Sequence, residues 1–483
     1  MNSNTVRDPR RWWILGALCL ALLVLVIDNT VLNLAIPTLN QDMGATPSDI
    51  QWIIDAYILA FAGLLLTSGS LSDKYGRRRF LIIGLIFFGG ASLLAVVVTE
   101  PWQLIAARFL MGVGGALVMP STLSILMTVF DETERRKAMA AWSAVALVGM
   151  VSGPTLGGFL LEHYWWGSVF LLNIPVAAIA VVAALVLMPE TRSAGRRIDP
   201  VGVVLSIVGL TAAVYVIIER EWNIPVIALA VVALVAFVIW ERRQDEPMLP
   251  LFLFASRDFS GASFSILLMS FGAGAVMLML TQYLQFVLGY GAMQAGLAML
   301  PYAVAAAVFN GVGAGLGKRL SNRVLVGSGL LLMAGGFVVM ALTTGYLPLL
   351  TGLVIMGMGG GLAGPSAYAS LMGAIPVDHA GVGSALNDTV QQVGMALSIA
   401  VLGSVLAGRY TAEMPADLPA AARESIGGAH ALGLTEAANQ AFTSAMHLGS
   451  WVGGAFCVAA ALLAVTMLRP QAPAPETPEP VNV

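Results

Sequence analysis

Four ionisable side chains interrupt stretches of the sequence that are otherwise apolar and long enough to cross a membrane. They are Asp28, Asp55, Arg108 and Asp388. An ionised side chain at the centre of a bilayer costs roughly 2.5 to 3.5 kcal/mol even on permissive scales, unless it is paired or hydrated. Charged residues at this depth are typical of ion and proton pathways. We therefore predict that these four residues take part in proton coupling.

Asp28 offers the clearest chemistry of the four. It lies about ten residues from the end of its apolar stretch, or ~15 Å deep at 1.5 Å per helical residue. Burial favours the protonated form of a carboxyl group, whereas a bound cation favours the ionised form. A proton and a cationic compound would then compete for one group, which is the simplest mechanism of exchange. The alternative is a permanent ion pair with Arg108, which lies ~10 Å deep in its own stretch.

Polar residues at helical spacing mark a second candidate region. Asn387, Asp388, Gln391 and Gln392 share one face of a predicted helix, and a polar face inside a bundle is typical of a water-lined path. Asp55, by contrast, lies only four residues inside its stretch, where we expect hydration near the membrane surface. The residues predicted to contact a transported compound are Asp28, Asn33, Tyr57, Tyr302, Tyr368, Asn387, Asp388, Gln391 and Gln392.

The sequence has no arrangement of residues typical of an enzyme: no nucleophile beside a base, no cluster of metal ligands and no phosphate-binding loop. A net charge of −3 gives no reason to expect nucleic acid as a partner. We therefore expect a protein that is not an enzyme and that needs no metal or cofactor, with protons as its coupling ion.

The composition requires a lipid environment for the elements that position these residues. Hydrophobic residues make up 58% of the 483 residues and charged residues 11%, with a mean hydropathy of +0.85. Apolar stretches of about 20 residues, the length that crosses a ~30 Å hydrocarbon core, recur between short charged clusters. We predict an all-α membrane protein of fourteen transmembrane helices, with the lipid bilayer as a partner.

The basic residues predict how these helices are oriented. If the N-terminus is cytoplasmic, 20 Lys and Arg residues fall in cytoplasmic segments and three, Arg220, Arg409 and Arg423, fall outside. This asymmetry satisfies the positive-inside rule. We expect a multi-pass protein of the bacterial inner membrane with both termini in the cytoplasm. Short surface helices are expected in the long outer loop from Arg409 to Phe442.

The two halves of the chain match each other at a constant offset of 245 residues. The pairs include Gly112 with Gly357, Gly114 with Gly359, and Pro120 with Pro365. A parallel repeat of this kind is typical of transporters that rock two halves around a central site. The predicted domains are a six-helix bundle (1–190), an inserted two-helix linker (191–257), a second six-helix bundle (258–468) and a disordered cytoplasmic tail (469–483).

The loop after the second predicted helix resembles the cytoplasmic signature loop of the major facilitator superfamily. It carries Gly69, Asp73, Gly76, Arg77 and Arg78 at the spacing of that signature. Asp73 could pair with a nearby arginine or cap a helix, while the two glycines allow close approach and a tight turn. Such an ion pair, here called the charge lock, would stabilise one conformation of the protein and break in another.

A second motif, in predicted helix five, resembles the motif of the superfamily's antiporters. Its residues are Gly149, Gly153, Pro154, Gly157 and Gly158. Small residues at four-residue spacing let helices approach closely, and the proline permits a bend. A packing seam follows from the residues themselves, and antiport is what the resemblance implies.

The predicted first two helices are similar to those of fourteen-helix drug:proton antiporters of the QacA type, and this likeness extends over nearly the whole chain. It implies the major facilitator fold and proton-coupled export of drugs or antibiotics by alternating access. We expect the protein to work as a monomer. QacA-type exporters of dications carry several acids on helix thirteen, where this chain keeps only Asp388. We therefore expect neutral or singly cationic hydrophobic compounds. The alternatives are a translocator of lipids or cell-wall precursors, and a proton-coupled importer of a metabolite.

Overall fold

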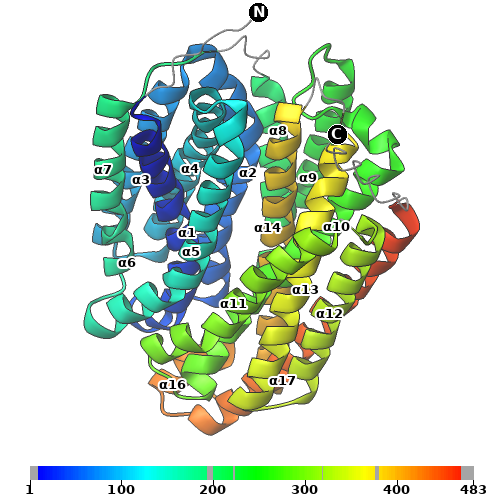
Figure 1. The fold of residues 1–483 in the computed structure, drawn as a ribbon. Helices are drawn as coiled ribbons and strands as arrows, with labels where there is room; N and C mark the ends of the chain where they lie inside the picture. The colour runs from blue at the N-terminus through cyan, green and yellow to red at the C-terminus, as the bar shows by residue number, and fades with distance from the viewer. Residues whose placement is uncertain (1–8, 193–198, 221–222, 318, 376–379, 469–483) are drawn as a thin grey trace, which may run out of the picture.

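The computed structural model describes residues 9–192, 199–220, 223–317, 319–375 and 380–468, and the regular structure in these ranges is helical (Figure 1). The first group of helices is α1 (Arg11–Asp42), α2 (Pro47–Tyr75), α3 (Arg77–Val97), α4 (Pro101–Val129), α5 (Glu132–His163), α6 (Ser168–Leu171) and α7 (Asn173–Leu187). A hairpin of α8 (Pro200–Glu219) and α9 (Ile224–Arg243) follows. The second group is η1 (Leu251–Ala255), α10 (Arg257–Gln282), η2 (Tyr283–Val287), α11 (Ala292–Leu316), α12 (Asn322–Leu342), α13 (Tyr346–Gly373), α14 (Ala380–Glu413), α15 (Ala420–Glu424), α16 (Ile426–Ala431) and α17 (Thr435–Met467).

Thirteen helical segments in the described part of the chain are long and apolar enough to cross a membrane. The predicted all-α membrane fold is therefore confirmed, although the predicted number of fourteen is not reached by this measure. Helix α5 is not among the thirteen, but it is 32 residues long and packs beside α1 and α11. The predicted domain boundaries stay predictions, and the predicted tail (469–483) lies outside the described residues.

Sequence signals at the helix ends set several of these boundaries. Before α2, the Thr46 hydroxyl accepts a hydrogen bond from the Asp49 backbone N–H, and the Asp49 carboxylate accepts one from the Thr46 N–H. Pro47 occupies the first turn, where its missing N–H leaves no bond unmade. Between α2 and α3, Gly76 has a φ of +125°, which favours glycine. The chain therefore turns sharply there without unwinding either helix.

The same glycine contacts recur in the two groups at the predicted offset of 245 residues. A Cβ on Gly112 of α4 would overlap the backbone carbonyl of Tyr57 in α2, and one on Gly357 of α13 would overlap that of Tyr302 in α11. Gly114 and Gly359 likewise approach the backbones of α3 and α12. Because the absence of a side chain permits each approach, these contacts support the internal repeat.

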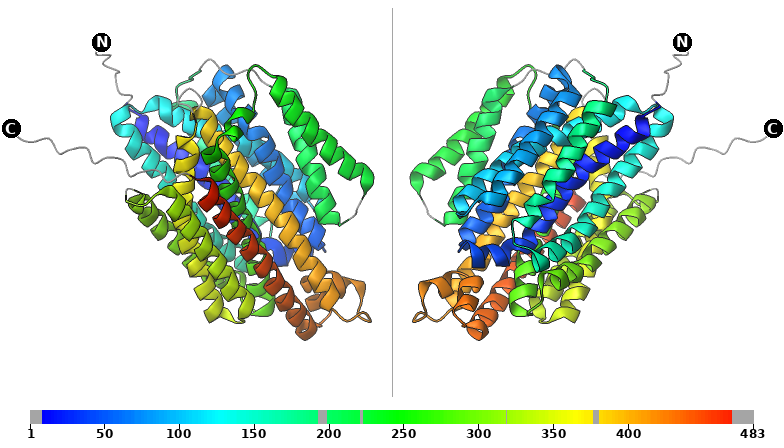
Figure 2. Two further views of the ribbon diagram at one scale, coloured as in Figure 1. Left: turned by 90° about the vertical axis from the view of Figure 1, so that its right-hand side faces the viewer. Right: turned by 90° about the vertical axis from the view of Figure 1, so that its left-hand side faces the viewer.

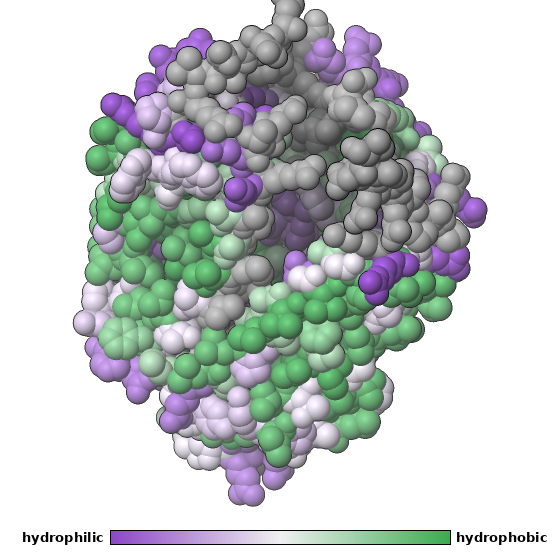
Figure 3. Space-filling model, viewed as in Figure 1, coloured by the Kyte–Doolittle hydropathy of each residue, from purple (hydrophilic) through white to green (hydrophobic). Residues whose placement is uncertain are grey.

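The two groups meet closely at one end of the molecule and separate at the other. Figure 2 shows that α1 begins and α17 ends toward one end, which we call the termini face, whereas α15 and α16 lie at the opposite end, the α16 face. Near the α16 face, Gly158 of α5 packs against the backbone at Ala292 and Met293 of α11. At the termini face, the surface is hollowed between the groups, and the hollow has hydrophilic walls (Figure 3). The α16 face is thus the closed end.

Helix α8 lies against both groups at once. Near the α16 face, the Glu219 carboxylate accepts hydrogen bonds from Ser48 Oγ (2.7 Å) and Trp52 Nε1 (2.8 Å) of α2. The backbone carbonyl of Ile217 accepts one from Ser404 Oγ (2.8 Å) of α14. The inserted hairpin is therefore attached across the line where α2 meets α14, and α9 packs mainly on α8.

Candidate functional site

The centre of the first group of helices holds a buried ion pair. Asp28 of α1 is 3% exposed, and its Oδ2 accepts a hydrogen bond of 2.5 Å from Arg108 Nη1 of α4, which is fully buried. Their sequence separation is 80 residues, so tertiary packing alone brings them together. Removing one member of such a pair leaves an uncompensated charge, which typically costs about 3 to 5 kcal/mol. The pairing weighed as an alternative in the sequence is thus present in this conformation.

Asn173, at the start of α7, completes the coordination of Asp28. Its Nδ2 donates to Asp28 Oδ1 at 2.7 Å and to Ser92 Oγ of α3 at 3.2 Å, and the residue is fully buried. Its own Oδ1 has no hydrogen-bond partner. Sequence reasoning missed Asn173, although a lone amide within an apolar stretch is a signal that could have singled it out.

Arg108 is held by two groups besides Asp28 Oδ2. Its Nε donates to the backbone carbonyl of Ile53 at 3.2 Å, and its guanidinium lies 4.4 Å from the ring centre of Tyr57, a cation–π contact. Tyr57 also stacks on Phe61 at 5.8 Å. Arg108 Nη2 has no hydrogen-bond partner, so the guanidinium retains one free donor group.

The burial of this network limits what two of its members can contact in this conformation. Asp28 and Tyr57 were expected to contact a transported compound, but they are 3% and 1% exposed. They lie among α1, α2, α4 and α7, and not on an open wall. In this conformation they have almost no surface with which to bind a compound directly.

Asp55 also differs from expectation. The sequence suggested a hydrated position near the membrane surface, but its side chain is fully buried and neither carboxyl oxygen has a hydrogen-bond partner. The side chain of Gln51, one turn earlier, packs against Gly403 of α14. Residues one turn apart differ by roughly 40° around a helix, so Asp55 also faces the α14 side of α2. An ionised carboxylate in that place would be buried without compensation.

The α14 polar face is partly buried. Asn387 is 6% exposed and donates to Asp388 Oδ1 at 3.0 Å, while Asp388, Gln391 and Gln392 are half-buried. The other predicted contact residues differ among themselves: Asn33 and Tyr302 are half-buried, whereas Tyr368 is 40% exposed. The predicted site residues therefore separate into the Asp28 network and residues spread over α1, α11, α13 and α14.

The signature loop is tied together by ion pairs. Arg77 Nε donates to Asp73 Oδ1 at 2.7 Å, as the predicted charge lock requires, and Arg77 Nη1 reaches the Ser124 carbonyl of α4 at 3.3 Å. Glu190, which sequence reasoning missed, accepts a hydrogen bond from the Arg78 backbone N–H at 3.1 Å. A Cβ on Gly76 would lie 2.7 Å from Glu190 Oε1. The loop is thus held by residues of α2, α4 and the segment after α7, while Gly69 packs near Pro120.

The helix-five motif forms two seams. Gly149, Gly153 and Gly157 face α1, where a Cβ on Gly157 would lie 2.7 Å from Val31 and one on Gly153 would overlap Thr30. Pro154 and Gly158 face α11 of the second group, where a Cβ on Gly296 would overlap the Pro154 carbonyl. The predicted close packing is confirmed, and the second seam joins the two groups near the α16 face.

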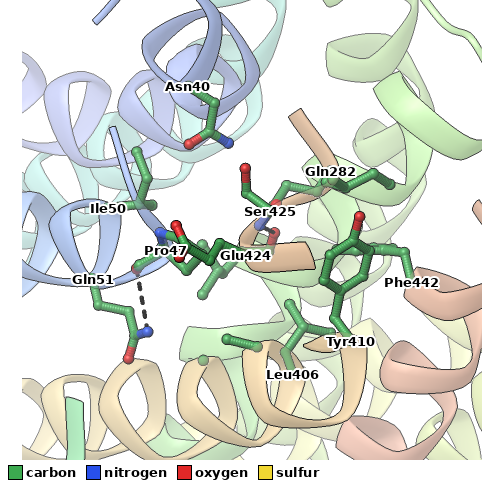
Figure 4. A pocket seen from close by; sticks show the side chains of 14 residues that line it. Asn40, Pro47, Ile50, Gln51, Gln282, Leu406, Tyr410, Glu424, Ser425 and Phe442 are labelled. Atoms are coloured by element: carbon green, nitrogen blue, oxygen red, sulfur yellow. Dashed lines mark hydrogen bonds between the residues drawn. The ribbon is translucent and has the colours of Figure 1, made fainter. Parts of the chain in front are cut away.

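A pocket remains at the closed end, between the two groups and beneath α15 and α16 (Figure 4). The loop from Arg409 to Phe442 does form the predicted short helices. The pocket encloses about 440 Å³ of empty space, part of it open to solvent. Its polar lining residues include Asn40, Gln51, Gln282, Tyr410, Glu424 and Ser425. The contact between the two groups is therefore incompletely packed beside Gln51, which lies one helical turn from Asp55.

Comparisons with known proteins agree with this architecture. The family described as the Major Facilitator Superfamily matches residues 18–399. The chain is 37% identical over 424 residues to the puromycin resistance protein pur8 of Streptomyces alboniger, covering 84% of each chain. It is 33% identical over 449 residues to the multidrug efflux pump LfrA of Mycolicibacterium smegmatis, covering 89% of each.

A solved structure shares the fold. The bacterial homolog of the human lysosomal transporter Spinster, in an inward-facing and unoccupied conformation, superposes with a TM-score of 0.72 at 17% identity. The match covers 97% of this chain and all of that one.

Proposed function

Because the chain belongs to the major facilitator superfamily, we propose that it exports hydrophobic, neutral or singly cationic drugs or antibiotics from the cytoplasm in exchange for protons. Relatives at 33% and 37% identity are named for multidrug efflux and for puromycin resistance, which supports drug export. The observation that carries proton exchange is the buried pair of Asp28 and Arg108 with its additional donor from Asn173.

The shape of the molecule and its charges are consistent with export. The α16 face is closed and the termini face is hollowed. The positive-inside rule supports a cytoplasmic termini face in a bacterial inner membrane. A compound would then enter the hollow from the cytoplasm, and its release would require the seam between α5 and α11 to open. The protein would work as a monomer, since each chain holds both groups of helices.

Proton exchange would take place at the Asp28 carboxyl group. A proton from outside neutralises Asp28, which weakens its attraction to Arg108 and frees the guanidinium to move. Loss of that proton to the cytoplasm restores the ion pair seen here. Because Asp28 is buried, a compound would act on it through the position of α1 and α4, and not by direct contact. The single acid on α14, Asp388, supports a preference for compounds with at most one positive charge.

Reconstituted protein tests the proposal directly. Purified protein should release protons when neutral and singly cationic aromatic compounds are added, and vesicles should accumulate these compounds only under a proton gradient. Metabolite uptake along the gradient would favour an importer, and movement of fluorescent phospholipids between leaflets would favour a lipid translocator. Either result without compound-dependent proton release would contradict the proposed export.

Asp55 gives a prediction about the closed α16 face. Since its carboxyl group has no partner, it should be protonated in this conformation, and Asp55→Asn should preserve the closed form. The variant could not ionise to favour opening, so we expect efflux to fall at least tenfold. Thermal stability should remain within ~1 kcal/mol, because no hydrogen bond is lost. Efflux in inverted vesicles and thermal unfolding in detergent measure the two effects. Full efflux activity in the variant would remove Asp55 from the mechanism.

A further inference from the structure

Asn173 is the residue of the Asp28 network whose chemistry suits both states of a titrating carboxyl group. The two oxygens of Asp28 are held separately, Oδ2 by Arg108 at 2.5 Å and Oδ1 by Asn173 at 2.7 Å. A guanidinium can only donate hydrogen bonds, so Arg108 can serve only a carboxylate lone pair. An amide has both donors and an acceptor, and can therefore serve an ionised or a protonated carboxyl group.

The unused atom of the amide is already in place. Asn173 Oδ1 is buried and has no hydrogen-bond partner, while Nδ2 is shared between Asp28 and Ser92. A half-turn of the amide about its terminal bond would exchange these two atoms. Oδ1 would then accept the hydrogen bond that a protonated Asp28 must donate. In either orientation one amide atom is without a partner, so neither orientation gains a hydrogen bond at the amide itself.

From this geometry we infer that Asn173 is a positioning residue, which turns its amide between donating to ionised Asp28 and accepting from protonated Asp28. The inference rests on proton exchange at Asp28 in the proposed function. It assigns Asn173 the role of pairing a buried carboxyl group in both of its protonation states. Without the Asn173 amide, one oxygen of ionised Asp28, or the hydroxyl proton of protonated Asp28, would be buried without a hydrogen-bond partner.

Few other groups can set the protonation of Asp28. Arg108 from α4 bonds to it, and the Tyr57 ring from α2 lies beside the Arg108 guanidinium. Helices α6 and α7 carry no charged residue, and the charged residues of α5 and α10 lie near their ends. Helices α11 and α16 also contact α1. Tyr302 of α11 packs within the second group, and His430 of α16 bonds to Asn439. A change at Asn173 should therefore be visible in the pH dependence of transport.

Two substitutions of similar volume change the hydrogen bonds that residue 173 offers to Asp28. Asn173→Leu removes both the donor and the acceptor, and Asn173→Asp replaces the amide by a second carboxyl group that shares a proton with Asp28. The first loses the donor to ionised Asp28 and the second places a like charge beside it, so the protonated form should persist to higher pH in both. We expect the pH midpoint of compound-driven proton release to rise by about 1 to 2 pH units in both variants. The matched control is Ser168→Ala, because Ser168 is buried nearby in α6 and its hydroxyl has no partner.

The measurement uses the full-length purified protein, with ethidium as the compound, over a range of pH, alongside thermal unfolding of each variant. A raised midpoint in both Asn173 variants and an unchanged one in Ser168→Ala is the expected result. Unchanged midpoints in folded variants, with proton release lost in Asp28→Asn, would overturn the role of Asn173 and leave the proposed function intact. Proton release that persists in Asp28→Asn would overturn both.

A second measurement uses the wild-type protein and needs no substitution. Infrared difference spectra of the wild-type protein between high and low pH should show a carboxyl band together with a changed side-chain amide band. Selective isotope labelling of asparagine identifies the amide contribution. A carboxyl band without any change in an asparagine amide would contradict the turning of Asn173.

Discussion

Replacing Asp28 with asparagine is expected to abolish proton-driven efflux from inverted vesicles, to the level of vesicles that lack the protein. The amide keeps the shape of the carboxyl group but cannot bind and release a proton. It also leaves the Arg108 guanidinium buried without its counter-charge, which is expected to destabilise the fold by about 3 to 5 kcal/mol. Loss of efflux must therefore be separated from loss of structure.

The double variant Asp28→Asn with Arg108→Met provides that separation. Replacing both members of a buried ion pair by neutral groups is often close to neutral for stability. We expect the double variant to unfold near the wild-type temperature and still to show no efflux. If it retained proton-driven efflux, the pair would be structural and the coupling would lie elsewhere, with Asp388 and Asp55 as the remaining candidates.

A valine at Gly296 of α11 is expected to hold the α16 face open and to stop transport. A Cβ at this position would overlap the carbonyl oxygen of Pro154 in α5, so the two helix backbones could not approach as they do here. The clash involves backbone on the α5 side and cannot be relieved by a change of rotamer. The closed form should become too unfavourable to populate, and efflux should fall by at least a hundredfold.

Gly311→Val is the matched control, because Gly311 lies on the same helix and its added side chain would meet open space. The conformational effect can be measured as the distance between spin labels on the α16-face ends of α5 and α11. In Gly296→Val this distance should lengthen relative to wild type and to Gly311→Val. A short distance with lost transport would mean that the valine disrupts α11 locally and that the seam is not the cause.

Much of the fold could be predicted because its signals are local. Apolar stretches of membrane-spanning length gave the all-α membrane class, and the constant offset between Gly112 and Gly357 anticipated matched contacts in the two groups. The spacing of small residues from Gly149 to Gly158 predicted close packing in the same way. Which partner each glycine approaches was not predictable, since it depends on how distant helices are arranged.

The site was predicted only in part, for the same reason. Depth along a helix follows from counting residues, so Asp28 and Arg108 could be matched as a pair. The side of the helix that another element covers does not follow from counting, so Asp55 was expected to be hydrated although α2 turns it toward α14. Asn173 and Glu190 were missed because their partners, Asp28 and Arg78, are 145 and 112 residues away in sequence.

The attachment of α8 to both α2 and α14 makes the two sides of the molecule unequal for compounds dissolved in the bilayer. Along one side, α8 covers the line where the two groups meet, from Ile207 beside Gly63 to Glu219 beside Ser48. In the part of the chain that the structure describes, α8 and α9 do not extend over the opposite line, between α5 and α11. A hydrophobic compound that approaches the hollow by lateral diffusion in the bilayer therefore meets α8 on one side, and α5 and α11 on the other.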